Sequence, residues 1–333
     1  MAPRALEQLI DGIAHADWLD KVAGPVSDKV TQVVPKGAVK DLLSGTFMGH
    51  PLHPVLTDLP IGFWTSAMAI DFLGGRRGQK AADRLVALGV LSALPTAATG
   101  LADWSDTIGE DRRLGLAHAA GNVVAVGLFG WSWVARKRGR RAKGVTLGVL
   151  GATAATAGAY LGGHLVWRKG VNVARHAWDH APDDWVGVTL ESPLEDGVPI
   201  VVTVGDDSVL VMLRGGTIHA ISDVCSHMGG PLHEGEVGGG PGGGCVTCPW
   251  HASAFSLDDG GVVHGPATAP QPAYDVRLEG DRLALRRRST VAPTTVAPAT
   301  AATLAPETAT PGANGQDSWP SSSSTPPTGT LQE

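Results

Sequence analysis

Cysteine, tyrosine and charged residues are all scarce in this chain of 333 residues. It has 3 cysteines and 2 tyrosines, and only 17% of its residues are charged, against about 25% in an average soluble protein. Because the cysteines are few and lie together between Cys225 and Cys248, a disulfide framework is excluded and a metal or redox site is favoured. A net charge of −6 and a pI near 6.0 argue against a nucleic-acid-binding protein, which usually has a basic surface, so no nucleic acid is expected as a partner.

Charge is scarcest between residues 50 and 167. Four apolar stretches lie there, each close to the ~20 residues that cross a bilayer as a helix, at 54–73, 85–102, 116–135 and 145–166. The alternative is a water-soluble four-helix bundle, which needs charged outer faces that these stretches lack. We therefore expect an all-α four-helix transmembrane bundle over residues 50–167, with the lipid bilayer as its partner.

Positive charges are shared unevenly among the loops of this region. The loops after the first and third stretches hold most of the Lys and Arg, and basic loops tend to stay in the cytoplasm. This rule predicts a multi-pass cell-membrane protein in which the residues after Trp167 are extracytoplasmic. Arg140 and Arg141 also resemble a twin-arginine export signal, which is read by a pathway for folded proteins. The alternative is that they belong only to the basic loop.

The flanking segments differ from the apolar region in composition. Residues 1–49 form an amphipathic N-terminal segment, either a surface helix or a helix in the membrane interface, with apolar residues at Leu6, Leu9, Ile10 and Ile13. Residues 168–182 form a juxtamembrane connector. Residues 183–287 contain Val-rich runs broken by Gly and Asp, which predict an all-β domain. Residues 288–333 are rich in Ser, Thr, Pro and Ala and predict a disordered tail.

Two short motifs in the β-rich segment hold residues that bind metals. Cys225 and His227 form a C-x-H pair, and Cys248 and His251 form a C-x-x-H pair. Two thiolates on one iron and two imidazoles on another would make an asymmetric [2Fe–2S] centre. A tetrahedral zinc site uses the same number of ligands and stays open at this point, although zinc motifs usually have other spacings.

The residues around these motifs resemble the Rieske family. The resemblance covers about 105 residues and is carried by Cys225-Ser-His-Met-Gly-Gly-Pro-Leu232, Cys248-Pro-Trp-His251 and Gly265-Pro266. It implies a small β-sandwich-like domain with two loops that clasp a [2Fe–2S] cluster at one tip. It also implies that Cys225, His227, Cys248 and His251 are the metal ligands.

Several positions depart from the high-potential members of this family. Gly230 and Trp250 stand where quinol-oxidising Rieske proteins have two additional cysteines, and Cys245 matches neither of them. Ser253 matches the hydroxyl that donates a hydrogen bond to a cluster sulfur, but Phe255 replaces a tyrosine donor. Because fewer donors stabilise the reduced cluster less, we expect a low potential, as in the ferredoxin and oxygenase branch. We expect Cys245 to be a small buried residue.

Four histidines belong to the apolar region or its edges, at His50, His53, His118 and His164. The predicted topology places all four toward the outer side of the membrane, where buried polar residues are costly and often functional. They are candidates for binding a b-type haem or a quinone headgroup, and the alternative is that they only meet lipid headgroups. The surrounding motifs resemble an uncharacterised bacterial four-span membrane family, which brings no established cofactor.

These observations predict a membrane-anchored Rieske protein that carries single electrons, with no substrate site of its own and an unidentified donor and acceptor. Two alternatives remain. One is a Rieske component of an oxygenase or reductase system, and the other is a membrane protein whose cluster senses redox state or iron.

Overall fold

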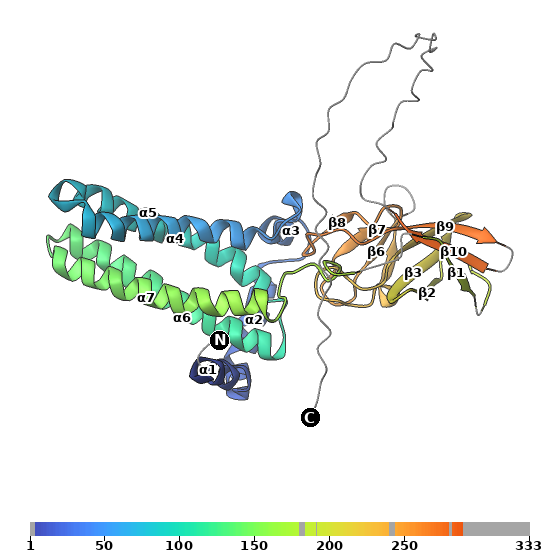
Figure 1. Ribbon diagram of the computed structural model, residues 1–333, viewed down its shortest axis with the longest axis horizontal. Coiled ribbons are helices and arrows are strands. Elements are labelled where there is room, and N and C mark those ends of the chain that lie inside the picture. Colours follow the sequence, from blue (N-terminus) through green and yellow to red (C-terminus); the bar gives the residue numbers. More distant parts are fainter. Residues whose placement is uncertain (1–3, 180–183, 191, 240–243, 280–281, 289–333) are drawn as a thin grey trace, which may run out of the picture. The chain divides into compact units, whose positions relative to one another are not determined.

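The computed structural model describes residues 4–179, 184–190, 192–239, 244–279 and 282–288 (Figure 1). The tail predicted for residues 288–333 lies outside the described residues from 289 onward. Helices come first in the chain and strands follow. The helices are α1 (Arg4–Ala14), η1 (Asp17–Leu19), α2 (Asp20–Val33), α3 (Ala38–Ser44), η2 (Thr46–Met48), α4 (Leu52–Leu73), α5 (Gly75–Trp104), α6 (Gly109–Lys137) and α7 (Arg141–Trp167).

Three of the four predicted spans are long and apolar enough to cross a membrane, namely α5, α6 and α7. They have 30, 29 and 27 residues, or about 40–45 Å at the helical rise of about 1.5 Å per residue. The fourth helix, α4, has 22 residues but carries His53, Asp58 and Asp71 and does not join this set. A helical membrane region is therefore supported, and the fourth span remains a prediction.

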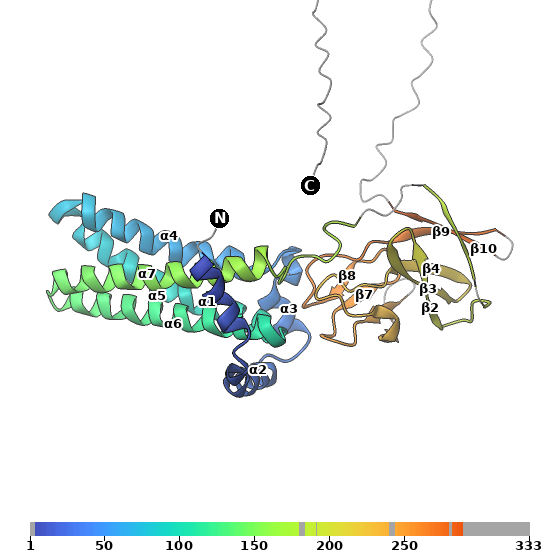
Figure 2. The same cartoon turned by 60° about the horizontal axis from the view of Figure 1, so that its bottom comes forward.

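The long helices pack as two hairpins, α4 with α5 and α6 with α7 (Figures 1 and 2). Between the hairpins, the indole of Trp64 on α4 stacks on the ring of Phe129 on α6. The ring centres are 4.1 Å apart and the ring planes differ by 7°. Both side chains are buried, together with Val86 and Ala93 of α5. Aromatic stacking therefore joins the two hairpins at their centre.

The N-terminal segment folds into short helices, and α1 packs on α6. Ile10 and Ala14 are buried against Leu114 of α6, whereas Leu9 is 60% exposed. The helical spacing of the apolar residues thus correctly placed Ile10 on the buried face, but Leu9 is not buried. Whether the segment meets a membrane surface stays a prediction.

The strands form three antiparallel sheets, in the orders β1-β10-β9, β2-β3-β4 and β5-β6-β7-β8. The strands are β1 (Val186–Thr189), β2 (Pro199–Val204), β3 (Asp207–Arg214), β4 (Thr217–Ser222), β5 (Glu236–Gly238), β6 (Cys245–Thr247), β7 (Ala254–Ser256), β8 (Val262–His264), β9 (Tyr274–Glu279) and β10 (Arg282–Arg287). Val209 to Met212 in β3 are all buried, because both faces of this strand contact apolar side chains. The predicted all-β domain is confirmed in the described residues.

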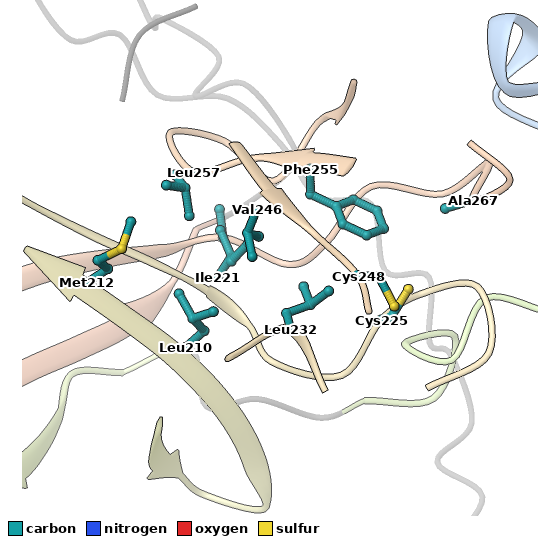
Figure 3. Close-up of a cluster of buried hydrophobic side chains, with 11 residues drawn as sticks. Leu210, Met212, Ile221, Cys225, Leu232, Val246, Cys248, Phe255, Leu257 and Ala267 are labelled. Carbon is teal, nitrogen blue, oxygen red and sulfur yellow. The ribbon is translucent and has the colours of Figure 1, made fainter. Parts of the chain in front are cut away.

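One of the two β-domain cores leads directly to the predicted metal ligands. Leu210, Ile221, Leu232 and Phe255 pack together in this core, and Figure 3 shows the sulfurs of Cys225 and Cys248 side by side at its end. Burial of these large apolar side chains supports the loops that hold the cysteines.

Candidate iron-sulfur site

The first motif lies in the loop that follows β4. The backbone N–H of Cys225 donates to the carbonyl of Gly230 at 2.9 Å, and the N–H of Gly229 donates to the carbonyl of Cys225 at 2.8 Å. Gly229 has a φ of 82°, in the left-handed region that favours glycine. A Cβ atom at Gly230 would lie 2.8 Å from the sulfur of Cys248. The loop therefore closes tightly and brings its backbone against the second motif.

The second motif lies in the turn between β6 and β7. The N–H of Cys248 donates to the carbonyl of Ser253 at 2.8 Å, and the N–H of Ala252 donates to the carbonyl of Cys248 at 3.1 Å. Ala252 has a φ of 63°, which is uncommon for a residue with a side chain. Such backbone strain is concentrated at functional sites, where the surrounding structure maintains it.

The structure brings the four predicted ligands together as a thiol pair and an imidazole pair. The thiols of Cys225 and Cys248 are buried and hydrogen-bond to each other. The ring centres of His227 and His251 are 5.1 Å apart, with the ring planes nearly perpendicular. The bond from Cys225 lowers the pKa of the Cys248 thiol, and the N–H groups of Trp250 and His251 add to this effect. N–H groups directed at sulfur suit a thiolate that binds iron.

The imidazole of His227 has a buried nitrogen that lacks a partner. Its Nδ1 makes no hydrogen bond, and burial is the main cause that lowers the pKa of His227 to about 3. Burial also lowers the pKa of His251. Both rings are therefore neutral at physiological pH, which is the state in which imidazole binds metals. A buried nitrogen without a partner fits a metal ligand.

The arrangement of these side chains distinguishes between the two kinds of metal site. Among the described residues, no three His, Cys, Asp or Glu side chains are grouped to hold one metal ion. A structural zinc site needs four such ligands on one ion. In a Rieske centre, by contrast, each of two irons takes only two protein ligands. The separate thiol and imidazole pairs therefore favour the [2Fe–2S] cluster.

The other residues singled out around the motifs have different roles. The hydroxyl of Ser253 is buried and accepts a hydrogen bond from the N–H of Ala267 at 2.9 Å, so its own proton is free for a cluster sulfur. Phe255 is fully buried and offers no donor. Cys245 is half-buried rather than buried as expected, and its sulfur lies 3.8 Å from the carbonyl of Gly239. Cys245 begins β6 and pairs with Gly238 of β5.

Three charged residues near His227 were not identified from the sequence. Oδ2 of Asp106, between α5 and α6, lies 3.7 Å from Nε2 of His227 and 2.7 Å from Nζ of Lys40 on α3. The N–H of Arg175 donates to the carbonyl of Ser226 at 3.2 Å. No local pattern marks these residues, because they are far from both motifs in the sequence and only folding brings them to the cluster ligands.

The Lys40–Asp106 ion pair leads to a prediction about the cluster potential. Lys40→Gln removes a positive charge near His227, which destabilises the more negative reduced cluster, so the midpoint potential should fall. Asp106→Asn removes a negative charge and should raise it. Redox titration followed by EPR measures both shifts, with Lys21→Gln on α2 as the control. Shifts of the same sign in the two variants, or no shift in either, would contradict this prediction.

The structure also separates the four membrane histidines into two groups. The rings of His53 on α4 and His118 on α6 approach each other, with their centres 6.4 Å apart. His50 precedes α4 and is exposed, and His164 lies near the end of α7. The sequence offered no basis for this division, because all four histidines share a predicted depth in the membrane.

Two family models match this chain in different regions. Residues 184–275 match the Rieske [2Fe-2S] domain. Residues 49–175 match a family described as predicted membrane proteins (DUF2231). The two matches cover the β-rich and the apolar parts of the chain.

Relatives with known roles match about a third of this chain or less. The anthranilate 1,2-dioxygenase ferredoxin subunit of Burkholderia cepacia is 31% identical over 95 residues, which are 28% of this chain and 84% of the relative. The cytochrome b6-f complex iron-sulfur subunit of Chlorobaculum tepidum is 28% identical over 92 residues, and the chain spans about half (48%) of it. A solved structure, the ferredoxin of carbazole 1,9a-dioxygenase from Nocardioides aromaticivorans IC177, is 30% identical and covers 31% of this chain and 98% of that one, with a TM-score of 0.28. With its thiol and imidazole pairs on two loops, the chain belongs to the Rieske [2Fe–2S] family and joins this domain to a predicted membrane-protein domain.

Proposed function

We propose that this protein is a membrane-anchored carrier of single electrons, with a [2Fe–2S] cluster held by Cys225, Cys248, His227 and His251. The observation that carries the proposal is the pairing of two buried thiols and two neutral imidazoles on adjacent loops. The unpartnered Nδ1 of His227 supports it, since a bound metal would compensate for the burial of this nitrogen. A cluster of this kind passes one electron at a time between partners.

The hydrogen-bond donors around the ligands support a potential toward the low end of the Rieske range. This range runs from about −150 to +300 mV, and donors to the cluster sulfurs raise the potential by stabilising the reduced state. Ser253 supplies one donor, whereas Phe255 supplies none. The cluster should therefore behave like that of a ferredoxin rather than that of a quinol-oxidising protein.

The proposed topology has four membrane spans and an extracytoplasmic Rieske domain. It rests on the basic residues clustered where α4 meets α5 and where α6 meets α7, because such clusters tend to stay in the cytoplasm. In the structure, the first of these clusters lies in the opening turns of α5 rather than in the loop that the sequence predicted. A reporter enzyme that works only outside the cytoplasm should be active when it is fused after residue 290. Activity of a reporter that works only in the cytoplasm would contradict this orientation.

The neighbouring histidines His53 and His118 supply a second redox group in this proposal. Two neutral imidazoles on different helices can bind a haem iron, and a single imidazole can hydrogen-bond to a quinone carbonyl. Either group would connect the cluster to the bilayer, where quinones and haem proteins exchange electrons. The donor and the acceptor are then one membrane component and one partner oxidoreductase.

The experiment that tests the proposed function is purification of the full chain in detergent, followed by reduction and low-temperature EPR. We expect a Rieske-type signal, with iron and acid-labile sulfide present in equal amounts because each cluster contains two of each. Mixing with an oxidised one-electron acceptor should remove the signal. Tightly bound zinc without iron after anaerobic preparation would overturn the proposal.

A second candidate function is the Rieske component of an oxygenase system. The observation that favours it is the match over most of a dioxygenase ferredoxin subunit, which extends over 84% of that relative. In that case the reduced protein should lose its EPR signal rapidly on mixing with an oxygenase component, but not with a membrane quinone. The opposite preference would favour the membrane carrier.

A further inference from the structure

The two helix hairpins of the membrane domain repeat the same arrangement of residues. In α4, Trp64 follows His53 by eleven residues, and in α6, Phe129 follows His118 by the same interval. Asp71 and Arg136 each follow those histidines by eighteen residues. The three residues of α4 therefore have counterparts at the same positions of α6.

The second helix of each hairpin carries the matching repeat. The ring of His53 hydrogen-bonds through Nδ1 to the carbonyl of Thr96 on α5 at 2.9 Å, and His118 bonds in the same way to Gly158 on α7 at 2.7 Å. Four residues beyond each carbonyl is a glycine, Gly100 in α5 and Gly162 in α7. A Cβ at Gly100 would lie 2.6 Å from the ring of His53. One at Gly162 would lie 2.9 Å from the ring of His118. In each hairpin, the histidine of the first helix therefore bonds to a carbonyl of the second helix and packs on a glycine of that helix.

Equivalent residues of the two hairpins meet each other. The rings of His53 and His118 are neighbours, Trp64 stacks on Phe129, and Arg136 forms an ion pair with Asp71. Only residues on a two-fold axis contact their own counterparts, so these pairs define a pseudo-two-fold axis between the hairpins. Transporters with parallel repeats have such an axis along the membrane normal, and their binding sites lie at the interface of the repeats.

The hydrogen bonds of the histidine pair determine which nitrogens are available. Because each Nδ1 donates to a backbone carbonyl, each neutral ring keeps its lone pair on Nε2. The amide nitrogen of Asn122 lies 3.2 Å from Nε2 and 3.4 Å from Nδ1 of His118, so it sits over the ring face rather than in the ring plane. Nε2 of each ring therefore carries the lone pair that can bind a ligand.

The separation of the two rings fits one metal atom between them. A metal–imidazole bond is about 2.0–2.1 Å long, and the ring centre lies roughly 1.1 Å behind the nitrogen, so two axial imidazoles have centres roughly 6.3 Å apart. The observed separation is 6.4 Å. No third His, Cys, Asp or Glu is grouped with the pair among the described residues. The remaining donors can come from the ligand itself, and a porphyrin supplies four of them.

We infer that His53 and His118 are the two axial ligands of one haem iron, held between the hairpins. This inference rests on the proposed function, because it names the membrane redox group that exchanges electrons with the cluster. Its position is suited to that role. Gly100 packs against the ring of His53 and is four residues from the end of α5, or roughly 6 Å along the helix axis. Just beyond that end, Asp106 approaches His227.

The test uses the full chain, expressed in a membrane-competent host with ample haem and purified in detergent. We expect Soret and α bands of a low-spin haem, at about one haem per chain by the pyridine haemochromogen assay. His53→Ala and His118→Ala should each lower the haem content at least tenfold, while the Rieske EPR signal stays. His50→Ala and His164→Ala are the matched controls and should keep the haem. Restoration of the haem bands in His118→Gly by added imidazole separates a ligand role from a folding defect.

The outcomes of this test are separable from those of the proposed function. A Rieske EPR signal without haem in the unmodified protein would overturn the haem inference and leave the carrier function intact; bound quinone in its place would do the same. Haem retained in both His53→Ala and His118→Ala, but lost in His50→Ala or His164→Ala, would also overturn it. Loss of the Rieske signal in the unmodified protein would overturn the proposed function instead.

Discussion

Cys225→Ser and Cys248→Ser are each expected to abolish the Rieske EPR signal and the bound iron, whereas Cys245→Ser should keep both. A serine hydroxyl is far less acidic than a thiol and is a poor ligand for iron at neutral pH. Each of the first two cysteines is buried beside the other, so loss of one leaves an iron with a single thiolate. Cys245 is half-buried at the start of β6, between β5 and β7, and its sulfur takes no part in this pair.

Iron content and EPR intensity per chain are the measurements for these three variants. The matched control, Cys245→Ser, changes the same chemical group within three residues of Cys248, so it accounts for general effects of serine on the domain. An EPR signal of normal intensity in Cys225→Ser or Cys248→Ser would contradict the ligand assignment. Loss of the signal in Cys245→Ser would instead implicate that thiol in the cluster.

Asp71→Ala and Arg136→Ala are expected to destabilise the membrane domain strongly. The guanidinium of Arg136 makes two hydrogen bonds to the carboxylate of Asp71, and both side chains are only 1% exposed. Removing one partner of a buried ion pair leaves the other charge without compensation, which typically costs ~3–5 kcal/mol. Thermal unfolding in mild detergent, followed by size-exclusion chromatography, measures the loss.

Two further residues complete this charge cluster and provide controls. Arg141 bonds to both Asp71 and Asp83, and the two arginines and two aspartates balance in charge. Because Arg141 is 26% exposed, Arg141→Ala should cost less than Arg136→Ala. The double variant Asp71→Leu with Arg136→Leu keeps the net charge. Its loss of stability should be smaller than the sum of the losses in the two single variants. Additive losses would contradict a buried pair.

The ion pairs of Arg141 also affect how the twin-arginine hypothesis is tested. Replacement of Arg140 and Arg141 by lysine removes the proposed export signal. It also replaces the two hydrogen bonds of the Arg141 guanidinium, one to Asp71 and one to Asp83, with those of a single ammonium. The variant Arg141→Lys alone is therefore needed beside the double variant. Export lost only in the double variant would support a role for the arginine pair as a signal.

The predicted cluster ligands and the division into apolar and β-rich parts could both be proposed from the sequence. Cys225 and His227, like Cys248 and His251, are neighbours in the chain, so their spacing in each loop is a local property. Helical and strand segments are similarly local, because the length and periodicity of apolar residues determine them. Cys245 and Leu9 show the limit of this reasoning, since their exposure depends on what packs over them.

Folding alone decided which distant residues meet. Asp106 and Lys40 approach His227 from other elements, and nothing in the sequence of either motif predicts these contacts. The same holds for His53 and His118, which are separate in the chain and become a pair only where two hairpins pack about a common axis. Such contacts depend on the packing of whole helices, and side chains at equal spacing in two helices become neighbours only when the helices take one particular arrangement.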